Sequence, residues 1–296
     1  MKEGVRDLLL VKIAYKEEHN FIRDIQGIKD ILKNKDIKIG MSEFIENDTH
    51  FIKVFCDDSQ YSEEVKSKVI LYISNVLYDI IIDNFRKKEL LEYLTENYFF
   101  LKHSEMLEID RKVNRVLKQQ ERILNEDSIY CVNRISAMQS MINDFIQEDY
   151  FINIDGFIRF RLRTMLPYIE QIIEKVVESY LVEKEYNEFI NLLKYFVDIQ
   201  DSKIEEVNIF IKNDGAYIIK DKSGNDIFKE FINDLVENKE DKAINPEDII
   251  ISGLITNSPK HINIYNRESC SNREFLNTIS NVFGERVSFE KTINIL

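Results

Sequence analysis

The chain has 296 residues, of which 44% are hydrophobic and 31% charged, and its formal net charge is -13. This composition is typical of a folded protein with a sizeable core and excludes an intrinsically disordered chain. The net negative charge disfavours long-range attraction of the whole protein to nucleic acid or to anionic lipid, so nucleic acid is not expected as a partner.

We predict the cellular compartment from targeting and disulfide signals that are absent from the sequence. The opening stretch MKEGVRDLLLVKIAYKEEH has too short an apolar run, with too many charges after it, for a secretory signal. No segment reaches the roughly 20 continuous apolar residues that span a bilayer. The widely spaced Cys56, Cys131 and Cys270 suggest neither a disulfide framework nor a zinc site. We therefore predict a cytoplasmic protein without a transmembrane segment, and we predict no metal and no cofactor.

Residues 1–60 are predicted to form a small α/β unit. LLLVKIAY has the composition of a strand, and FIRDIQGIKDIL places its apolar residues at helical spacing. IKIGMSEFIENDTHFIKVF then indicates two strands around the turn signal Asn47-Asp48. The predicted order is β-α-β-β.

Residues 61–204 are predicted to form a helical body, which begins at Ser62 as an N-cap before two glutamates. Within it, one continuous helix is expected over residues 168–199, because no Gly or Pro stands near residue 182. At 100° per residue, the two halves of this helix have apolar arcs on nearly opposite sides. The first arc holds Ile169, Ile172, Ile173, Val176 and Tyr180, and the second holds Val182, Tyr186, Phe189, Leu193 and Phe196. We expect both arcs to be buried against different neighbours.

Residues 205–296 are predicted to form a C-terminal α/β unit. A β-hairpin is expected around residues 213–215, and a helix over PEDIIISGLI with Asn245 as its N-cap. HINIY and RVSFE indicate strands on either side of the helix FLNTISNVF, which Ser271 and Glu274 cap and Gly284 ends. This βαβ-like unit implies a parallel crossover. The predicted fold class is therefore α+β, with a predominantly helical central body and small mixed sheets from both ends of the chain.

Three arginines alternate with apolar residues in FIRFRLR, residues 157–163, which we call the arginine segment. Strict alternation favours a strand, but Asp155 offers an N-cap and the helical pattern continues downstream, so a helix is predicted. On a helix Arg159 and Arg163 share one face, while Arg161 points almost the opposite way into apolar surroundings.

An arginine in apolar surroundings needs a carboxylate, because an unpaired buried charge costs at least several kcal/mol. Glu185 lies within the second apolar arc and Glu183 lies at its edge, so Glu185 is the predicted partner of one arginine. The pair could be a structural ion pair that fixes helix register. It could also be a site in which Glu185 is a general base and the arginines hold an anion. No catalytic residue is predicted, because no nucleophile, metal set or histidine accompanies this cluster.

A basic stripe is predicted in IDRKVNRVLKQQERIL, where Arg111, Arg115, Lys118 and Arg122 repeat at helical spacing. One interpretation is a solvated face balanced by neighbouring acids, which is the usual meaning of such a run. The other is a docking surface for a phosphate or an acidic partner. The stripe has no interleaved aromatic residues on which bases could stack, which argues against single-stranded nucleic acid.

The stretches GFIRFRLR and SYLVEKEYNEFINLLKYFVDIQ resemble the YtxC-like family of sporulation proteins from endospore-forming bacteria. EDIIISGLITNSPKHINIYN also resembles the tail of that family, so the resemblance covers roughly residues 95–290. It implies a role around spore formation and supplies no catalytic residues. The sequence departs from the family pattern at Pro167, where a kink or a helix start is expected.

Two functional hypotheses follow. The favoured one is a non-catalytic sporulation-associated protein that binds another protein through its helical body or its C-terminal unit. The other is an enzyme or binding protein that acts on an anionic small molecule at the Arg/Glu cluster. The hypotheses differ in whether that cluster lines an open pocket or is covered by packed side chains.

Overall fold

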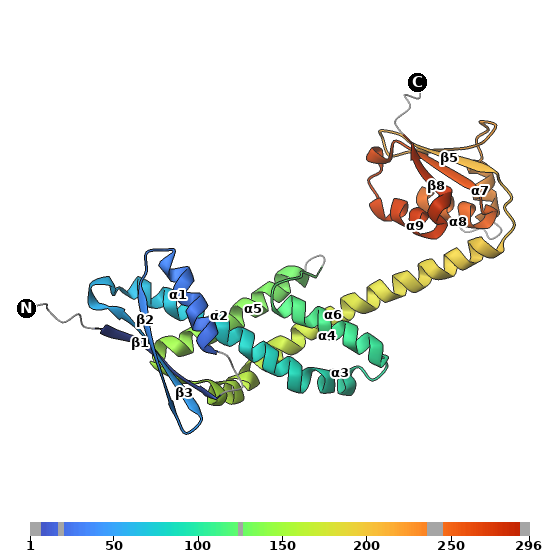
Figure 1. Ribbon diagram of the computed structural model, residues 1–296. Coiled ribbons are helices and arrows are strands. Elements are labelled where there is room, and N and C mark those ends of the chain that lie inside the picture. The colour runs from blue at the N-terminus through green and yellow to red at the C-terminus, as the bar shows by residue number, and fades with distance from the viewer. Residues whose placement is uncertain (1–6, 17–20, 124–126, 236–244, 291–296) are drawn as a thin grey trace, which may run out of the picture. The chain divides into compact units, whose positions relative to one another are not determined.

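The structure is a computed structural model that describes residues 7–16, 21–123, 127–235 and 245–290 (Figure 1). The chain divides into two compact units, residues 1–181 and 182–296. In the described part, each unit contains a four-stranded mixed sheet, and helices dominate between the two sheets along the sequence. The predicted α+β fold class is therefore confirmed. The finer division into residues 1–60, 61–204 and 205–296 stays a prediction.

The sheet of the first unit has the strand order β2-β3-β1-β4. Its elements are β1 (Asp7–Lys16), α1 (Phe21–Lys33), β2 (Ile39–Glu46), β3 (Thr49–Asp57) and β4 (Phe151–Asn153). The first four follow the predicted order. Asn47 and Asp48 both have positive φ, at 48° and 60°, as a tight hairpin turn between twisted strands requires. Strand β4 was not predicted; it pairs in parallel with β1 immediately before a long helix.

Helices make up the rest of the first unit. They are α2 (Glu63–Phe85), α3 (Leu91–Asn97), α4 (His103–Leu117), α5 (Asp127–Glu148) and the first part of α6 (Ile154–Ile199). The predicted start of α2 is confirmed, because the Ser62 hydroxyl accepts a hydrogen bond from the Val65 N–H at 3.1 Å. Between α2 and α3, residues Arg86–Leu90 form a π-helix. Segments of this kind are rare and occur frequently at functional sites.

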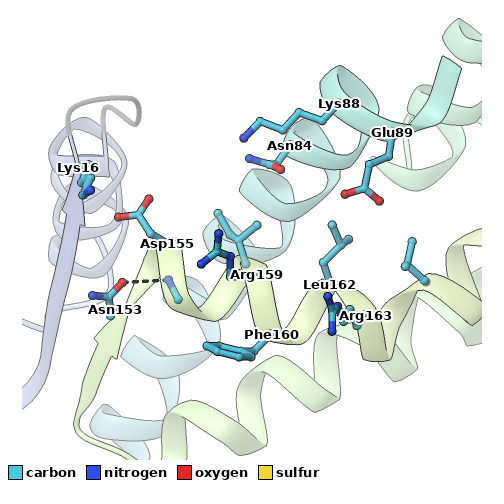
Figure 2. Close-up of a pocket in the computed structure, with 13 residues that line it drawn as sticks. Lys16, Asn84, Lys88, Glu89, Asn153, Asp155, Arg159, Phe160, Leu162 and Arg163 are labelled. Carbon is cyan, nitrogen blue, oxygen red and sulfur yellow. Dashed lines mark hydrogen bonds between the residues drawn. The ribbon is translucent and has the colours of Figure 1, made fainter. Parts of the chain in front are cut away.

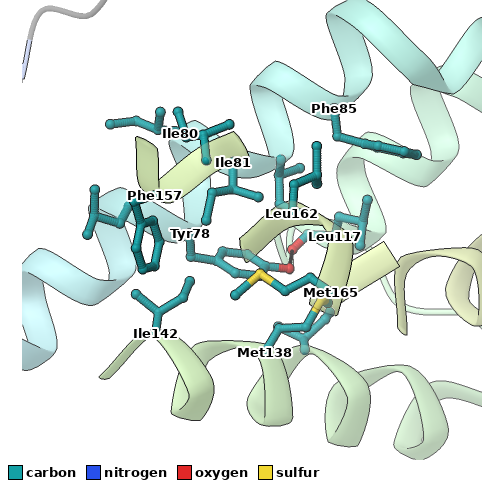
Figure 3. Packing of buried hydrophobic residues seen from close by; sticks show 14 of the residues in the cluster. Tyr78, Ile80, Ile81, Phe85, Leu117, Met138, Ile142, Phe157, Leu162 and Met165 are labelled. Atoms are coloured by element: carbon teal, nitrogen blue, oxygen red, sulfur yellow. Dashed lines mark hydrogen bonds between the residues drawn. The ribbon is translucent and has the colours of Figure 1, made fainter. Parts of the chain in front are cut away.

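The core of the first unit is largely apolar, and one of the phenols buried in it belongs to Tyr78. Figure 3 shows Tyr78 of α2 among Ile142 of α5 and Leu162 and Met165 of α6, all of which are buried. The Tyr78 hydroxyl donates a hydrogen bond to the Leu117 carbonyl at 2.9 Å, so the polar atom has a partner at depth. Burial raises the pKa of Tyr78 above its ordinary value. This tyrosine therefore stays protonated, as a donor, at neutral pH.

Helix α6 is continuous for 46 residues and includes the whole arginine segment, so both helix predictions are confirmed. It begins earlier than expected. Asn153, and not Asp155, accepts a hydrogen bond at its start, from the Gly156 N–H at 3.0 Å. Pro167 lies inside the helix, so the expectation of a helix start at that residue is wrong. Because proline has no N–H, the ladder of backbone hydrogen bonds lacks one member there.

The second unit has the strand order β6-β5-β7-β8. Its elements after α6 are β5 (Glu206–Ile211), β6 (Tyr217–Asp221), α7 (Phe228–Leu235), α8 (Pro246–Asn257), β7 (His261–Tyr265), α9 (Arg273–Phe283) and β8 (Val287–Glu290). Strands β5 and β6 form the predicted hairpin, and β7 and β8 pair in parallel across α9, as the βαβ-like unit requires.

Local capping signals in the second unit were predicted with mixed success. Asn245 caps α8 as expected, accepting from the Glu247 N–H at 3.2 Å. The predicted capping box of Ser271 and Glu274 is wrong. Asn272 caps α9 instead, with its side-chain oxygen accepting from the N–H groups of Glu274 and Phe275. Asparagine and serine are almost equally good caps, so two adjacent candidates cannot be ranked from sequence.

Candidate functional site

The described residues of the first unit form a cleft of about 820 Å³. It lies between the first three turns of α6, the C-terminal end of α2 with the π-helix, and the end of β1 (Figure 2). Ile158, Leu162 and Leu166 supply an apolar floor. The charged and amide side chains that line it are Lys16, Asn84, Lys88, Glu89, Asn153, Asp155, Arg159 and Arg163.

Two arginines of the arginine segment enter this cleft together. Arg159 and Arg163 are one helical turn apart, so they share a face of α6, as predicted. In Figure 2, Asn84 and Lys88 extend from the opposite wall toward the side of α6 that carries Arg159. The π-helix contributes both Lys88 and Glu89 to that wall.

The side chains that line the cleft have a net positive formal charge, although the whole chain is acidic. Four cationic side chains line it, Lys16, Lys88, Arg159 and Arg163, against the two carboxylates Glu89 and Asp155. Within the part of the chain that the structure describes, none of the four cations makes an ion pair, a side-chain hydrogen bond or a cation–π contact. Their charge is therefore left to solvent or to a ligand.

Arg161 lies on the other side of the helix and has a different partner from the predicted one. Its guanidinium carbon is 4.5 Å from the centroid of the Phe145 ring. This contact borders a second, smaller cavity of about 370 Å³, lined mainly by phenylalanines. A cation over an aromatic face is stabilised by the ring quadrupole, and the half-buried arginine needs no carboxylate. The phenylalanines around the arginine segment thus provide the compensation that Glu185 was expected to provide.

The predicted pairing of Glu185 with the arginine segment is wrong. Both belong to α6, and Glu185 lies 24 residues beyond Arg161 along the same continuous helix. At a rise of about 1.5 Å per residue, this spacing corresponds to about 36 Å along the helix axis. Glu183 and Glu185 are both exposed, and neither lines the cleft. The five residues proposed as one charge cluster therefore do not form one site.

The second apolar arc of α6 is also placed differently from the prediction. Ile190 and Val197 are the buried side chains of this stretch, and they belong to the core of the second unit. Leu193 is only partly buried. The other predicted core residues are exposed, with Val182 at 63% and Phe189 at 54% of their full accessibility. We call the set Val182, Tyr186, Phe189, Leu192, Tyr195, Phe196 and Ile199 the exposed face of α6.

The basic stripe is shorter than predicted, and some of its charges are neutralised. Helix α4 ends at Leu117, so Arg122 lies beyond it. Arg115 pairs with Glu121 at 2.6 Å, and Lys118 pairs with Asp83 at 2.7 Å. This placement agrees with a solvated face balanced by acids more closely than with a docking surface. Gln119, which has a φ of 56°, turns the chain away from the helix axis.

One polar network lies inside the second unit. Glu247, at the first turn of α8, accepts hydrogen bonds from the Tyr217 hydroxyl at 2.5 Å and from the Asn272 amide. Burial, together with the hydrogen bond to Glu247, raises the pKa of Tyr217. The network joins β6, α8 and the cap of α9, and its donors and acceptors satisfy one another. It is a structural staple, because each oxygen of Glu247 accepts a hydrogen bond from a side chain outside α8.

Several cleft residues escaped prediction from the sequence. Lys16, Asn84, Lys88 and Asn153 come from four separate elements, and no spacing rule connects them to the arginine segment. The π-helix was not predicted either, although the buried residues Phe85 and Leu90 are five positions apart. Among the described residues, no group of three or more His, Cys, Asp or Glu side chains is arranged to hold a metal ion. No described helix combines the length and apolar character that crossing a bilayer requires.

Comparison with known proteins places the chain in a family. The model of the YtxC-like family matches residues 71–288, which include the cleft wall, the arginine segment and the second unit up to β8. The uncharacterized protein YtxC of Bacillus subtilis (strain 168) is 22% identical over 223 residues, covering 73% of this chain and 75% of that protein. No solved structure matches the chain. The chain therefore belongs to the YtxC-like family.

Proposed function

We propose that this chain is a sporulation-associated, non-catalytic protein that acts by binding another protein. The observation that carries the proposal is the exposed face of α6. Its seven large apolar side chains cluster within 18 residues of one helix. A contiguous apolar surface of this kind on a folded protein marks an interaction site.

The spacing on this face also indicates the kind of partner. Val182, Tyr186, Phe189, Leu192 and Phe196 follow one another at steps of four, three, three and four residues. Steps of four and three are the pattern with which one helix packs along another. The partner surface that fits is therefore an amphipathic helix of another protein, laid along residues 182–196.

The link to sporulation is supported by membership in the YtxC-like family, through the resemblance of its defining stretches to sporulation proteins. The proposal includes a cytoplasmic location. Cys56, Cys131 and Cys270 are all free thiols, and two of them are buried. Unpaired cysteines are the rule in a reducing compartment.

A site-specific crosslinking experiment tests the proposal. The full chain, carrying a photoreactive phenylalanine analogue at position 189, is expressed in sporulating and in vegetative cells of the source bacterium. We expect a discrete adduct from sporulating cells that is lost when Val182 and Phe196 are both changed to Glu. Heat-resistant spore counts should fall in the V182E/F196E strain.

The matched control places the same analogue at position 99, because Phe99 is 82% exposed but lies in the first unit. No adduct is expected there, and F99E should leave spore counts unchanged. An adduct of the same size from both positions, or normal sporulation of V182E/F196E, would refute the proposal.

A further inference from the structure

The cleft of the first unit combines charge and shape in a way that the proposed protein interaction does not use. Its four cations converge on one concavity in a chain whose formal net charge is -13. Elsewhere in the first unit, Arg115 and Lys118 each pair with a neighbouring acid. The cleft cations make no such pair within the described part of the chain.

Three of the four cations line the cleft from two elements, α6 and the π-helix. Arg159 and Arg163 project from adjacent turns of α6, and Lys88 lines the cleft from the π-helix (Figure 2). Guanidinium groups donate in a planar fork that matches the oxygens of phosphate, and lysine adds a point charge. Asn84 and Asn153 also line the cleft, although the Asn153 oxygen is already engaged by the Gly156 N–H.

The remaining lining is apolar and suits a ligand that is more than an inorganic ion. Ile158, Leu162 and Leu166 form the floor, and the Phe160 ring, which is 72% exposed, stands at the edge. A volume of about 820 Å³ is within the range of small-molecule sites in proteins, and it is far larger than one phosphate needs. An exposed aromatic ring offers a stacking surface to a flat group.

We propose that this cleft binds a phosphate monoester that carries a flat apolar group, of which a nucleoside monophosphate is one example. The dianionic phosphate would lie among Lys88, Arg159 and Arg163, and the flat group would contact Phe160. Four cations against two carboxylates leave two positive charges in the cleft, which a phosphate dianion neutralises. A nucleic acid polymer is a poorer fit, because the acidic remainder of the chain would repel its backbone.

Isothermal titration calorimetry of the full chain tests this assignment at low ionic strength. The probes are AMP, phenyl phosphate, inorganic phosphate and adenosine. We expect AMP and phenyl phosphate to bind, and inorganic phosphate and adenosine each to bind at least about tenfold more weakly than AMP, because each lacks one of the two recognised groups. Affinity for AMP should also fall as salt rises.

The decisive variant is K88Q/R159Q, which removes two cations from the cleft. It should bind AMP at least about tenfold more weakly than the parent chain. The matched control is K87Q/R273Q, which removes the same formal charge from two exposed residues that do not line the cleft. Its affinity for AMP should remain within about twofold of the parent. Circular dichroism melting shows that both variants are folded.

Three results would overturn the proposal. The first is no binding of either AMP or phenyl phosphate at millimolar concentration, which would show that the cleft cations interact only with solvent. The second is an equal loss of affinity in K88Q/R159Q and K87Q/R273Q, which would show a general field effect. The third is inorganic phosphate or adenosine binding as tightly as AMP, which would contradict recognition of both groups. None of these results bears on the exposed face of α6, which belongs to the other unit.

Discussion

Helix α6 contains two stretches that look alike in sequence and differ in their surroundings. In residues 154–181 the apolar arc is buried, and Ile169, Ile172, Ile173 and Val176 are all inaccessible to solvent. In residues 182–199 an arc of similar apolar content is mostly exposed, and only Ile190 and Val197 are buried. Periodicity therefore shows which face of a helix requires cover. It does not show whether the same chain provides that cover.

The largest expected effect comes from truncating one side chain in each half. Ile172→Ala should lower the free energy of unfolding by about 2–5 kcal/mol, because it leaves a cavity in the core. Leu192→Ala, at a position that is 52% exposed, should change it by no more than about 0.5 kcal/mol. Urea unfolding followed by circular dichroism measures both. Similar losses in the two variants would mean that the exposed face is packed within the chain.

A smaller effect on the free energy of unfolding is expected at Tyr78, which packs beside residues 154–181 of α6. Tyr78→Phe removes the hydrogen bond to the Leu117 carbonyl and should cost about 1 kcal/mol at neutral pH.

The same residue also makes stability depend on alkaline pH. The folded-state pKa of Tyr78 is raised above the ordinary value of about 10, so the group stabilises the fold fully below pH 10. This contribution declines as pH rises above the unfolded pKa and toward the folded one. Between pH 9 and pH 11, the parent chain should therefore lose more stability than Tyr78→Phe. Parallel curves of unfolding free energy against pH for the two proteins would contradict this explanation.

The partner of Arg161 can be identified by a double-mutant cycle. Arg161→Gln and Phe145→Leu should show a coupling energy of about 0.5–1 kcal/mol, in keeping with a cation–π contact. The cycle of Arg161→Met with Glu185→Leu should give a coupling near zero, because those two residues lie far apart on one helix. Thermal or urea unfolding at one pH suffices for both cycles. A strong coupling in the second cycle would restore the ion pair that the sequence suggested.

The smallest effect is expected at the basic stripe. Arg115→Gln breaks an ion pair with Glu121 that is largely open to solvent, so its cost should be about 0.2–1 kcal/mol at low salt and should vanish in 1 M salt. Arg122→Gln serves as the control, because Arg122 is exposed and lies beyond the end of α4. A larger loss for Arg122→Gln than for Arg115→Gln would show that the stripe has an unrecognised structural partner.

The success of prediction from sequence depended on how local each signal is. Ser62 and Asn245 were identified as helix caps, because a cap bonds to a backbone group two or three residues away. The sharing of one face by Arg159 and Arg163 followed from helical geometry alone. Phe145 as the partner of Arg161 could not be predicted, because the two residues come from different helices that tertiary packing brings together. The cleft combines Lys16, Asn84 and Arg159 for the same reason.

The unbroken course of α6 has a consequence for how the protein folds during synthesis. Domains form in order as the chain leaves the ribosome, N-terminal part first. The slow step for a helix is its first turn, and each later residue adds a hydrogen bond to a turn that already exists. Once residues 154–181 have packed in the first unit, residues 182–199 can extend that helix without a new nucleation step. Ile190 and Val197 are thus already on a formed helix when the second unit emerges, and the sheet of that unit can assemble against them.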